Sequence, residues 1–191
     1  LTLRLLAANG VRSFYMGKLA GQIVQAVTTA PGNPGVLGQA DLALYQVVER
    51  PAVCQPYRAF EVCGMGPPSS GALTLGQILG LLDGFDLAAL GAQDPQAWRL
   101  IGDASRLAFA DRGRYMADSD YVPVPVKGLL AADYLAERAA LLQGETALEE
   151  VAPGTPDYDH ALNWADDTAI EFPSTSHISI VAAEGNVLSM T

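Results

Sequence analysis

The sequence is poor in basic residues and contains no long apolar run, and these two shortages exclude two classes of partner. Its 191 residues include 11 Lys and Arg against 21 Asp and Glu, which gives a formal net charge of -10. Such a surface repels nucleic acid phosphates and anionic lipid headgroups. No apolar stretch reaches the length of a helix that spans a bilayer. We therefore expect neither a nucleic acid nor a membrane as a partner.

Cysteine and histidine are also scarce, with two residues of each type. Cys54 and Cys63 flank a predicted turn and would be able to pair across it, but two thiols make neither a disulfide framework nor a metal site by themselves. Of the two states we favour free, half-buried thiols. We expect no metal and no cofactor.

The first residues carry no targeting information. The chain begins at Leu1 without an initiator Met, and it lacks the basic and apolar order of a secretion signal. It also stops at Thr191, inside a predicted strand. We expect a piece of a longer protein, and its localisation is not encoded in this piece.

Half of the residues are apolar, which is enough to bury a core, and many of them recur at helical spacing. The clearest helix begins at Asp94-Pro95, where a capping carboxylate precedes a proline with a pre-set backbone angle, and should end near Gly113. Thr74 and Gln77 have the spacing of a capping box at the start of another helix. The predicted helices are 20–27, 41–45, 74–82, 94–113 and 134–142.

Two short hairpins complete the predicted elements. The runs 47–53 and 57–62 are rich in Val, Tyr and Phe and are interrupted by Pro56. Near the end of the chain, 177–181 and 187–190 are typical of two strands joined by a turn. The predicted fold class is therefore α+β, mostly helical, with one short hairpin and one terminal β-hairpin.

The segment 143–174 differs from everything before it. It holds eight acidic residues and three prolines but no Lys or Arg, and its apolar residues show no regular period. A segment whose charges all have the same sign and which has few apolar residues typically stays solvated and does not pack. We expect this segment to be a mobile acidic tail and the least ordered part of the protein.

The chemistry centres on Thr175-Ser176-His177, two hydroxyls and an imidazole immediately before a predicted strand. A threonine hydroxyl is a poor nucleophile unless a base lies beside it, and for an N-terminal threonine that base is its own α-amino group. Such a role requires that the bond between Ser174 and Thr175 is cut. From the residues alone, an ordinary strand entry is the simpler interpretation, with His177 forming hydrogen bonds on the outer face of the strand.

Residues 175–181 (TSHISIV), followed by 184–186 (EGN), closely resemble the start of the small subunit in the gamma-glutamyltranspeptidase family of N-terminal-nucleophile hydrolases. Earlier segments resemble the same family in the same order, so that only 143–171 carries little signature. These earlier segments are 14–20, 41–45, 64–71 and 106–112. Two positions depart from the pattern: Ala182 stands where many relatives have Asp, and Ser176 where Thr is commoner.

The resemblance implies a precursor that cuts itself between Ser174 and Thr175. Residues 1–174 are then the C-terminal part of a large subunit, with 143–174 as its tail before cleavage, and 175–191 begin a small subunit with its first β-hairpin. Thr175 becomes both nucleophile and amino-terminal base, and it passes a gamma-glutamyl group from a small glutathione-type substrate to water or to an amine. The implied fold is the αββα sandwich of N-terminal-nucleophile hydrolases.

The same resemblance places the other site residues of the family outside this chain. The arginine that binds the substrate carboxylate would precede Leu1, and the second threonine, the amine-binding residues and the oxyanion glycines would follow Thr191. The chain is therefore expected to be inactive alone and to need the rest of its own large and small subunits as partners. Three alternatives stay open: a cephalosporin acylase, a poly-gamma-glutamate-cleaving relative, and a non-catalytic helical scaffold.

Overall fold

The computed structural model describes residues 2–158, 166 and 175–190, and the chain divides into two compact units, Leu1–Arg50 and Pro51–Thr191. The predicted helices near 20–27 and 41–45 are confirmed. Two earlier helices were not predicted, because Gly10, with a φ of 73°, breaks that stretch into pieces too short to display a helical period. The first unit contains α1 (Thr2–Asn9), α2 (Arg12–Tyr15), α3 (Lys18–Thr28) and α4 (Gln39–Ala43).

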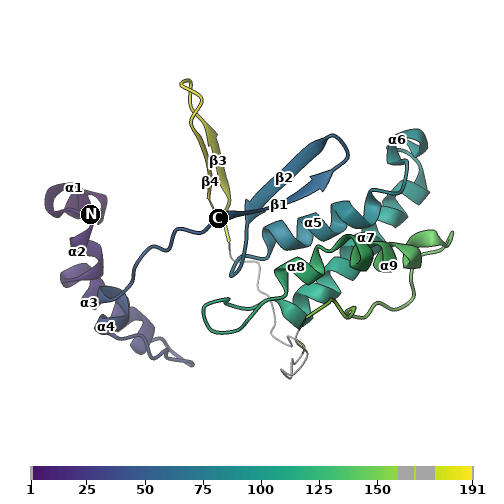
Figure 1. Cartoon of the computed structure of the whole chain (residues 1–191). Helices are drawn as coiled ribbons and strands as arrows, with labels where there is room; N and C mark the ends of the chain where they lie inside the picture. Colours follow the sequence, from purple (N-terminus) through teal and green to yellow (C-terminus); the bar gives the residue numbers. More distant parts are fainter. Residues whose placement is uncertain (1, 159–165, 167–174, 191) are drawn as a thin grey trace. The chain divides into compact units, whose positions relative to one another are not determined.

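The second unit is built around helix α5, which lies between a β-hairpin and two further helices (Figure 1). No helix in the described part of the chain combines the length and the hydrophobicity needed to cross a bilayer. The elements of this unit are β1 (Ala52–Tyr57), β2 (Phe60–Met65), α5 (Gly71–Leu82), α6 (Leu87–Leu90), α7 (Pro95–Tyr115), α8 (Val126–Leu129), α9 (Ala132–Ala140), a 3-10 helix (Leu141–Gln143), β3 (Ile178–Val181) and β4 (Val187–Met190).

The α+β class and the long helix α7 are confirmed, whereas the start of α5 differs from the prediction. Asp94 Oδ1 accepts a hydrogen bond from the Gln96 amide over 2.8 Å, so the predicted cap of α7 forms. The N-cap of helix α5 is Ser70, four residues before the cap that the Thr74 spacing indicated, and Thr74 and Gln77 are buried inside the helix. The capping prediction was wrong because Gln77 uses its side chain in the core instead.

The β1–β2 hairpin also differs from the prediction in where its strands and its turn lie. Pro56 lies within β1 and pairs with Glu61, and the turn falls at Arg58, whose φ is 54°. The prediction that Pro56 interrupts the strands was therefore wrong. A proline is tolerated here because both strands of a two-stranded sheet are edge strands, where the missing N–H leaves no ladder partner unpaired.

This register places Cys54 directly opposite Cys63, with their Cα atoms 4.0 Å apart, and the two residues form a disulfide. Both cysteines are exposed. The expectation of free, half-buried thiols was wrong on both counts. The pairing follows from the short turn, which brings the two positions opposite each other, and the exposure follows from strand alternation, because the neighbours on the other face pack against α5.

The main core lies where α5, α7 and α9 meet. Its buried residues are Leu81, Leu82, Leu100, Ala104, Leu107, Leu135 and Leu142. Leu100, Ala104 and Leu107 of α7 lie at helical spacing and pack with residues of α5 and α9, as expected of amphipathic helices. The expectation that the periodic apolar residues are all buried was wrong for Leu75 of α5 and Trp98 of α7, which are exposed.

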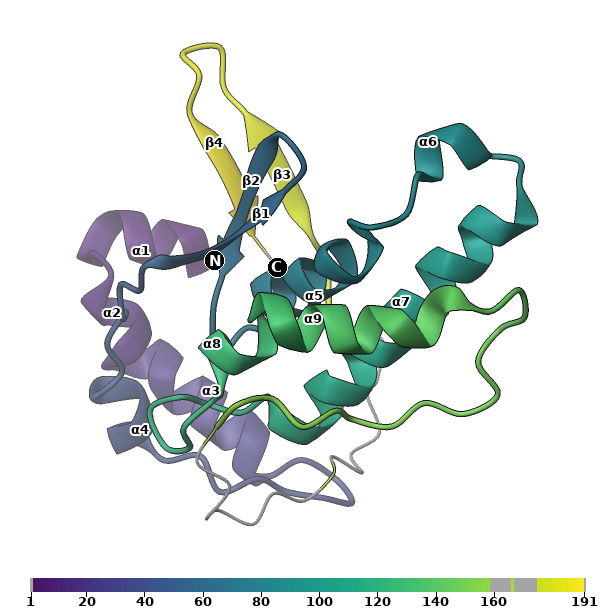
Figure 2. The ribbon, with the colours of Figure 1, turned by 45° about the vertical axis from the view of Figure 1, so that its right-hand side comes forward.

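The stretch 144–157, which we call the strap, runs from the end of the 3-10 helix back along the helices toward α8 (Figure 2). Leu148 and Val151 of the strap pack against the main core, and Pro156 is fully buried. At its far end the Asp157 carbonyl lies against Gly128 of α8. The strap therefore covers the helices as a packed segment.

The backbone of the strap is held by two buried carboxylates of α7. Leu148 N donates to Asp103 Oδ2 over 3.1 Å, and Gly154 N donates to Asp111 Oδ1 over 2.8 Å. The expectation that 143–174 forms a solvated tail therefore fails for the strap, because its anchors are backbone amides, which composition does not reveal. Of the remainder of this segment, 158–174, only residues 158 and 166 are described.

A substitution within the strap tests this packing. A Cβ added at Gly154 would overlap the Tyr134 hydroxyl and press on the Arg138 side chain. We expect Gly154→Ala to lower the free energy of unfolding by about 1–3 kcal/mol, measured by urea denaturation. Gly144→Ala is the matched control, because its Cβ would meet only Thr146 O at 3.9 Å; equal stability of the two variants would show that the strap is not packed.

Asp111 is the centre of a buried hydrogen-bond cluster that joins the strap to α5, α7 and α9. Its carboxylate is 1% exposed and accepts hydrogen bonds from Gln77 Nε2 at 2.7 Å, Tyr134 OH at 2.6 Å and Gly154 N at 2.8 Å. The Arg138 guanidinium lies 3.4 Å away and also donates to Ala152 O. We call these five residues, Asp111 with its four donors, the Asp111 cluster.

The ionisation of Tyr134 reflects this environment. Burial raises the pKa of the Tyr134 hydroxyl, and its hydrogen bond to the Asp111 carboxylate raises it further. The pKa of Tyr115 is raised as well, first by burial and then by the charge of Asp111. Both hydroxyls therefore stay protonated and act as donors, Tyr115 to Gly154 O at 2.7 Å, so the cluster has a structural role.

Candidate active site

The β3–β4 hairpin carries the predicted reactive sequence at its entry. The predicted terminal hairpin forms, and its antiparallel strands pair Ile178 with Met190 and Val181 with Val187. The turn is closed by a hydrogen bond from Ala182 N to Asn186 O at 2.9 Å, and Gly185 has a φ of 86°. Glycine adopts a positive φ without strain. This turn therefore sets the register of β3 against β4.

Thr175 lies three residues before β3 and is exposed, as is Ser176. The preceding residue of the predicted scissile bond, Ser174, lies outside the described residues. The hydroxyl of Thr175 is therefore accessible to a solvent molecule or to another part of the protein, which a nucleophile requires. Its catalytic role stays a prediction.

His177 sits beside two hydroxyls of the hairpin. Its Nε2 lies 3.0 Å from Ser179 Oγ and 3.4 Å from Ser189 Oγ. The three side chains share one face because positions 177 and 179 are two apart and Ser189 pairs with Ser179 across the strands. The expected hydrogen bonding of His177 is confirmed, but the expectation that it lies on the outer face of the strand was wrong, because His177 and Ser189 face a cavity beside β2 and α5.

A cavity of about 430 Å³ opens between this hairpin, β2 and the start of α5. Val62, Met65 and Leu75 contribute apolar surface to it, and His177 and Ser189 contribute polar groups. Thr175 is not among its lining residues. No local sequence motif indicates this cavity, because its walls come from three segments that are far apart along the chain.

A larger cavity, of about 460 Å³, lies away from the hairpin between β1, α5 and α9. Its lining includes Asp83 as the one ionisable side chain, with Gln55, Leu135 and several alanines and glycines. None of its described lining residues is a serine, threonine, cysteine or histidine. Size alone therefore does not identify the site, and the chemistry favours the region around Thr175 and His177.

The chain matches a family of known proteins over its whole length. The family model described as gamma-glutamyltranspeptidase matches residues 1–191. The chain is 35% identical over 191 residues to an acylase ACY 1 proenzyme of Pseudomonas sp. (strain V22), and 32% identical over 193 residues to a glutathione hydrolase proenzyme of Escherichia coli (strain K12). Each match covers 100% of this chain and 31% of the relative, so the chain spans about a third of the length of these curated relatives.

Solved structures give the same grouping. The gamma-glutamyltranspeptidase of Helicobacter pylori superposes with a TM-score of 0.75 and 34% identity, over 85% of this chain and 46% of that one. The cephalosporin acylase of Bacillus halodurans superposes with a TM-score of 0.70 and 31% identity, over 81% of this chain and 27% of that one. The similarity therefore extends from the sequence motifs to the backbone.

Proposed function

Because the chain belongs to the gamma-glutamyltranspeptidase family, we propose that it is the junction region of a self-processing amidase in which Thr175 is the nucleophile. The observation that carries this proposal is the position of Thr175, exposed and directly before the β3–β4 hairpin. The relatives named as proenzymes support a precursor that is cut. Residues 1–174 would then form the C-terminal part of the large subunit, and 175–191 the N-terminal part of the small subunit, within an αββα sandwich.

Self-cleavage would use the Thr175 hydroxyl against the carbonyl carbon of Ser174. The C–O bond forms as the C–N bond of the peptide breaks, which leaves an ester and a free α-amino group on Thr175. Water then hydrolyses the ester and releases the carboxylate of Ser174. The strap fixes the chain up to residue 157 and the hairpin fixes it from residue 178, so the scissile bond lies in the connection between two anchored elements.

After cleavage, the same hydroxyl would attack the gamma-carbonyl of a glutathione-type substrate. The free α-amino group of Thr175 accepts the hydroxyl proton, and a typical α-amino pKa of about 7.7 to 8.0 lets part of the population act as a base near neutral pH. The proton passes to the leaving amine as the acyl-enzyme ester forms. Water or an acceptor amine then takes the gamma-glutamyl group. The remaining parts of the large and small subunits would supply the substrate pocket.

A cephalosporin acylase is the second candidate, because the chain superposes on the cephalosporin acylase of Bacillus halodurans with a TM-score of 0.70 and 31% identity. The two activities differ in whether the acyl group of the substrate carries an α-amino group. A gamma-glutamyl group carries an α-amino group, and a glutaryl group does not. A site built to bind that ammonium rejects the analogue that lacks it by about 10⁴-fold in kcat/KM.

Assays of the full-length protein distinguish the candidates. We expect hydrolysis of a gamma-glutamyl anilide with a kcat/KM that exceeds that for the matched glutaryl anilide by about 10⁴-fold. Addition of a dipeptide acceptor should increase anilide release if transfer competes with hydrolysis. The reverse preference would replace the proposal with the acylase, and no turnover of either substrate by a cleaved protein would favour the non-catalytic scaffold.

A further inference from the structure

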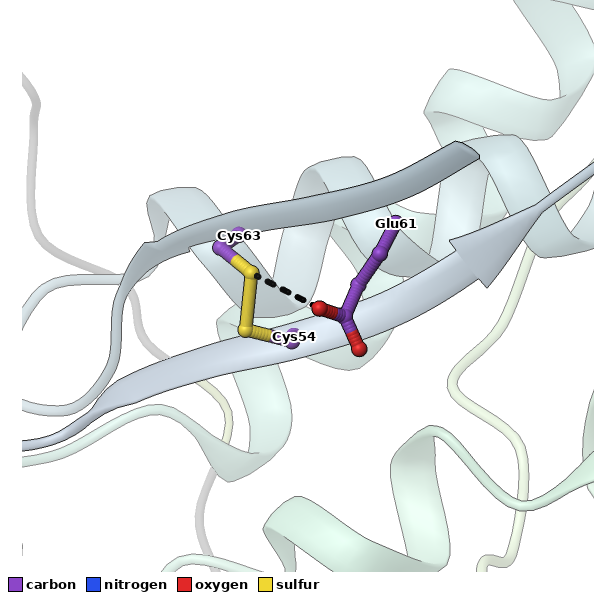
Figure 3. Close-up of a disulfide and its surroundings, with 3 residues drawn as sticks. All are labelled: Cys54, Glu61 and Cys63. Atoms are coloured by element: carbon purple, nitrogen blue, oxygen red, sulfur yellow. Dashed lines mark hydrogen bonds between the residues drawn. A yellow bond between two sulfur atoms is a disulfide. The ribbon is translucent and has the colours of Figure 1, made fainter. Parts of the chain in front are cut away.

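The solvent face of the β1–β2 hairpin brings together three side chains that bind metals. The Cys54 and Cys63 sulfurs and a Glu61 carboxylate oxygen all lie within 4.8 Å of one another, and all three residues are exposed (Figure 3). Glu61 Oε2 lies 3.8 Å from Cys63 Sγ. Glu61 and Cys63 are two apart on β2, and Cys54 faces Cys63 across the strands, so strand geometry itself gathers the three groups.

The opposite face of the hairpin holds it on the rest of the unit without help from the disulfide. Gln55 Nε2 donates to Leu130 O over 3.3 Å, and Gly64 lies so close to Ala72 of α5 that an added Cβ would be 3.2 Å from its Cβ. The strands are also joined by their own ladder over six residue pairs. Reduction of the disulfide should therefore leave the three side chains on the same face and within reach of one another.

We propose that the reduced hairpin binds a thiophilic divalent cation such as Zn²⁺ through Cys54, Cys63 and Glu61. Two thiolates and one carboxylate are a ligand set that zinc accepts, with water in the fourth position. With Zn–S bonds of about 2.3 Å, tetrahedral geometry separates the two sulfurs by about 3.8 Å. Directly opposed residues have Cβ atoms about 4.5–5.5 Å apart, so a small side-chain rotation provides that separation.

Reduction and oxidation of the two cysteines decide whether their sulfurs are available as ligands. Two small thiols reduce the disulfide to two cysteine thiols and are themselves oxidised to one disulfide. The cation then binds as both thiols lose their protons, which are released to the solvent. In the oxidised hairpin the sulfurs bond to each other and are not available as thiolates, so binding requires the reduced form. Hard cations such as Mg²⁺ are disfavoured by sulfur ligands.

Co²⁺ serves as the probe, because thiolate coordination gives it a charge-transfer absorption that zinc lacks. The full-length protein is reduced, freed of reductant under argon and titrated with Co²⁺. We expect a charge-transfer band that saturates at one Co²⁺ per chain above the Cys54→Ser/Cys63→Ser background, and that disappears when Zn²⁺ is added. The oxidised wild type should show no such increment.

Two single variants distinguish a ligand role of the Glu61 carboxylate from a nonspecific effect of negative surface charge. Glu61→Gln should weaken Co²⁺ binding by about tenfold or more, whereas Glu49→Gln, an exposed glutamate on the other unit, should leave it unchanged. Equal bands in the reduced wild type and the double serine variant would overturn the proposal. Equal affinity of Glu61→Gln and wild type would remove Glu61 from the site. Circular dichroism of the reduced wild type checks that the fold persists.

Discussion

Thr175→Ala should leave the full-length protein as one uncleaved chain with no measurable activity on gamma-glutamyl amides. One hydroxyl serves both reactions in the proposed mechanism, so both are lost together. Removal of the nucleophile commonly costs about a million-fold in kcat for hydrolases of this general kind. A denaturing gel and an intact-mass measurement report the cleavage, and release of the anilide reports the activity.

Two neighbouring variants serve as controls for this result. Thr175→Ser keeps a hydroxyl and should still yield two subunits, the smaller of which begins at position 175. Ser176→Ala removes the adjacent exposed hydroxyl and should be cleaved like the wild type. Two subunits from Thr175→Ala would refute the assignment of the nucleophile, and an uncleaved wild type would refute self-processing.

Asp111→Asn should cause a large loss of stability, about 3–5 kcal/mol in the free energy of unfolding. All four neighbours of the carboxylate are donors: Gln77 Nε2, Tyr134 OH, Gly154 N and the Arg138 guanidinium. An amide NH₂ therefore faces donors in either orientation, and Arg138, which is 8% exposed, loses its buried counter-charge. Removing one partner of a buried ion pair typically costs this amount.

The matched control is Asp83→Asn at the end of α5, where the carboxylate is exposed. Its effect should stay within about 0.5 kcal/mol. Urea denaturation followed by circular dichroism gives both values. A loss below about 1 kcal/mol for Asp111→Asn would mean that water replaces the missing acceptor, and the Asp111 cluster would then not be the buried anchor of the strap.

The longer helices of the second unit and the terminal hairpin were predictable because their signals are local. The Asp94 cap sets the start of α7, and the leucines of α5 repeat at helical spacing. The strands 178–181 and 187–190 were predicted within one residue, since a turn with Gly185 separates two alternating runs. The family was also recognisable from motifs alone, and the match over residues 1–191 confirms it.

The errors arose where a residue's partner is distant in the sequence or depends on register. Gln77 looked like a capping residue, yet it donates to Asp111, 34 positions later. Cys54 and Cys63 looked free until the turn at Arg58 set them opposite each other. The cavity beside His177 has walls from three separate segments, so no single motif could reveal it.

By itself, the sequence determined the periods of the longer helices, the cap of α7 and the reactive Thr175-Ser176-His177 run, because these depend on neighbours within a few residues. Only the tertiary structure decided what becomes of the acidic stretch after α9. Composition favoured a solvated tail, and the charged side chains of the strap do face water. The strap is anchored instead by backbone amides that donate to the carboxylates of Asp103 and Asp111. Every residue type except proline carries an equivalent backbone amide. This anchoring therefore cannot be predicted from composition, because it depends on the folded α7 and its buried carboxylates.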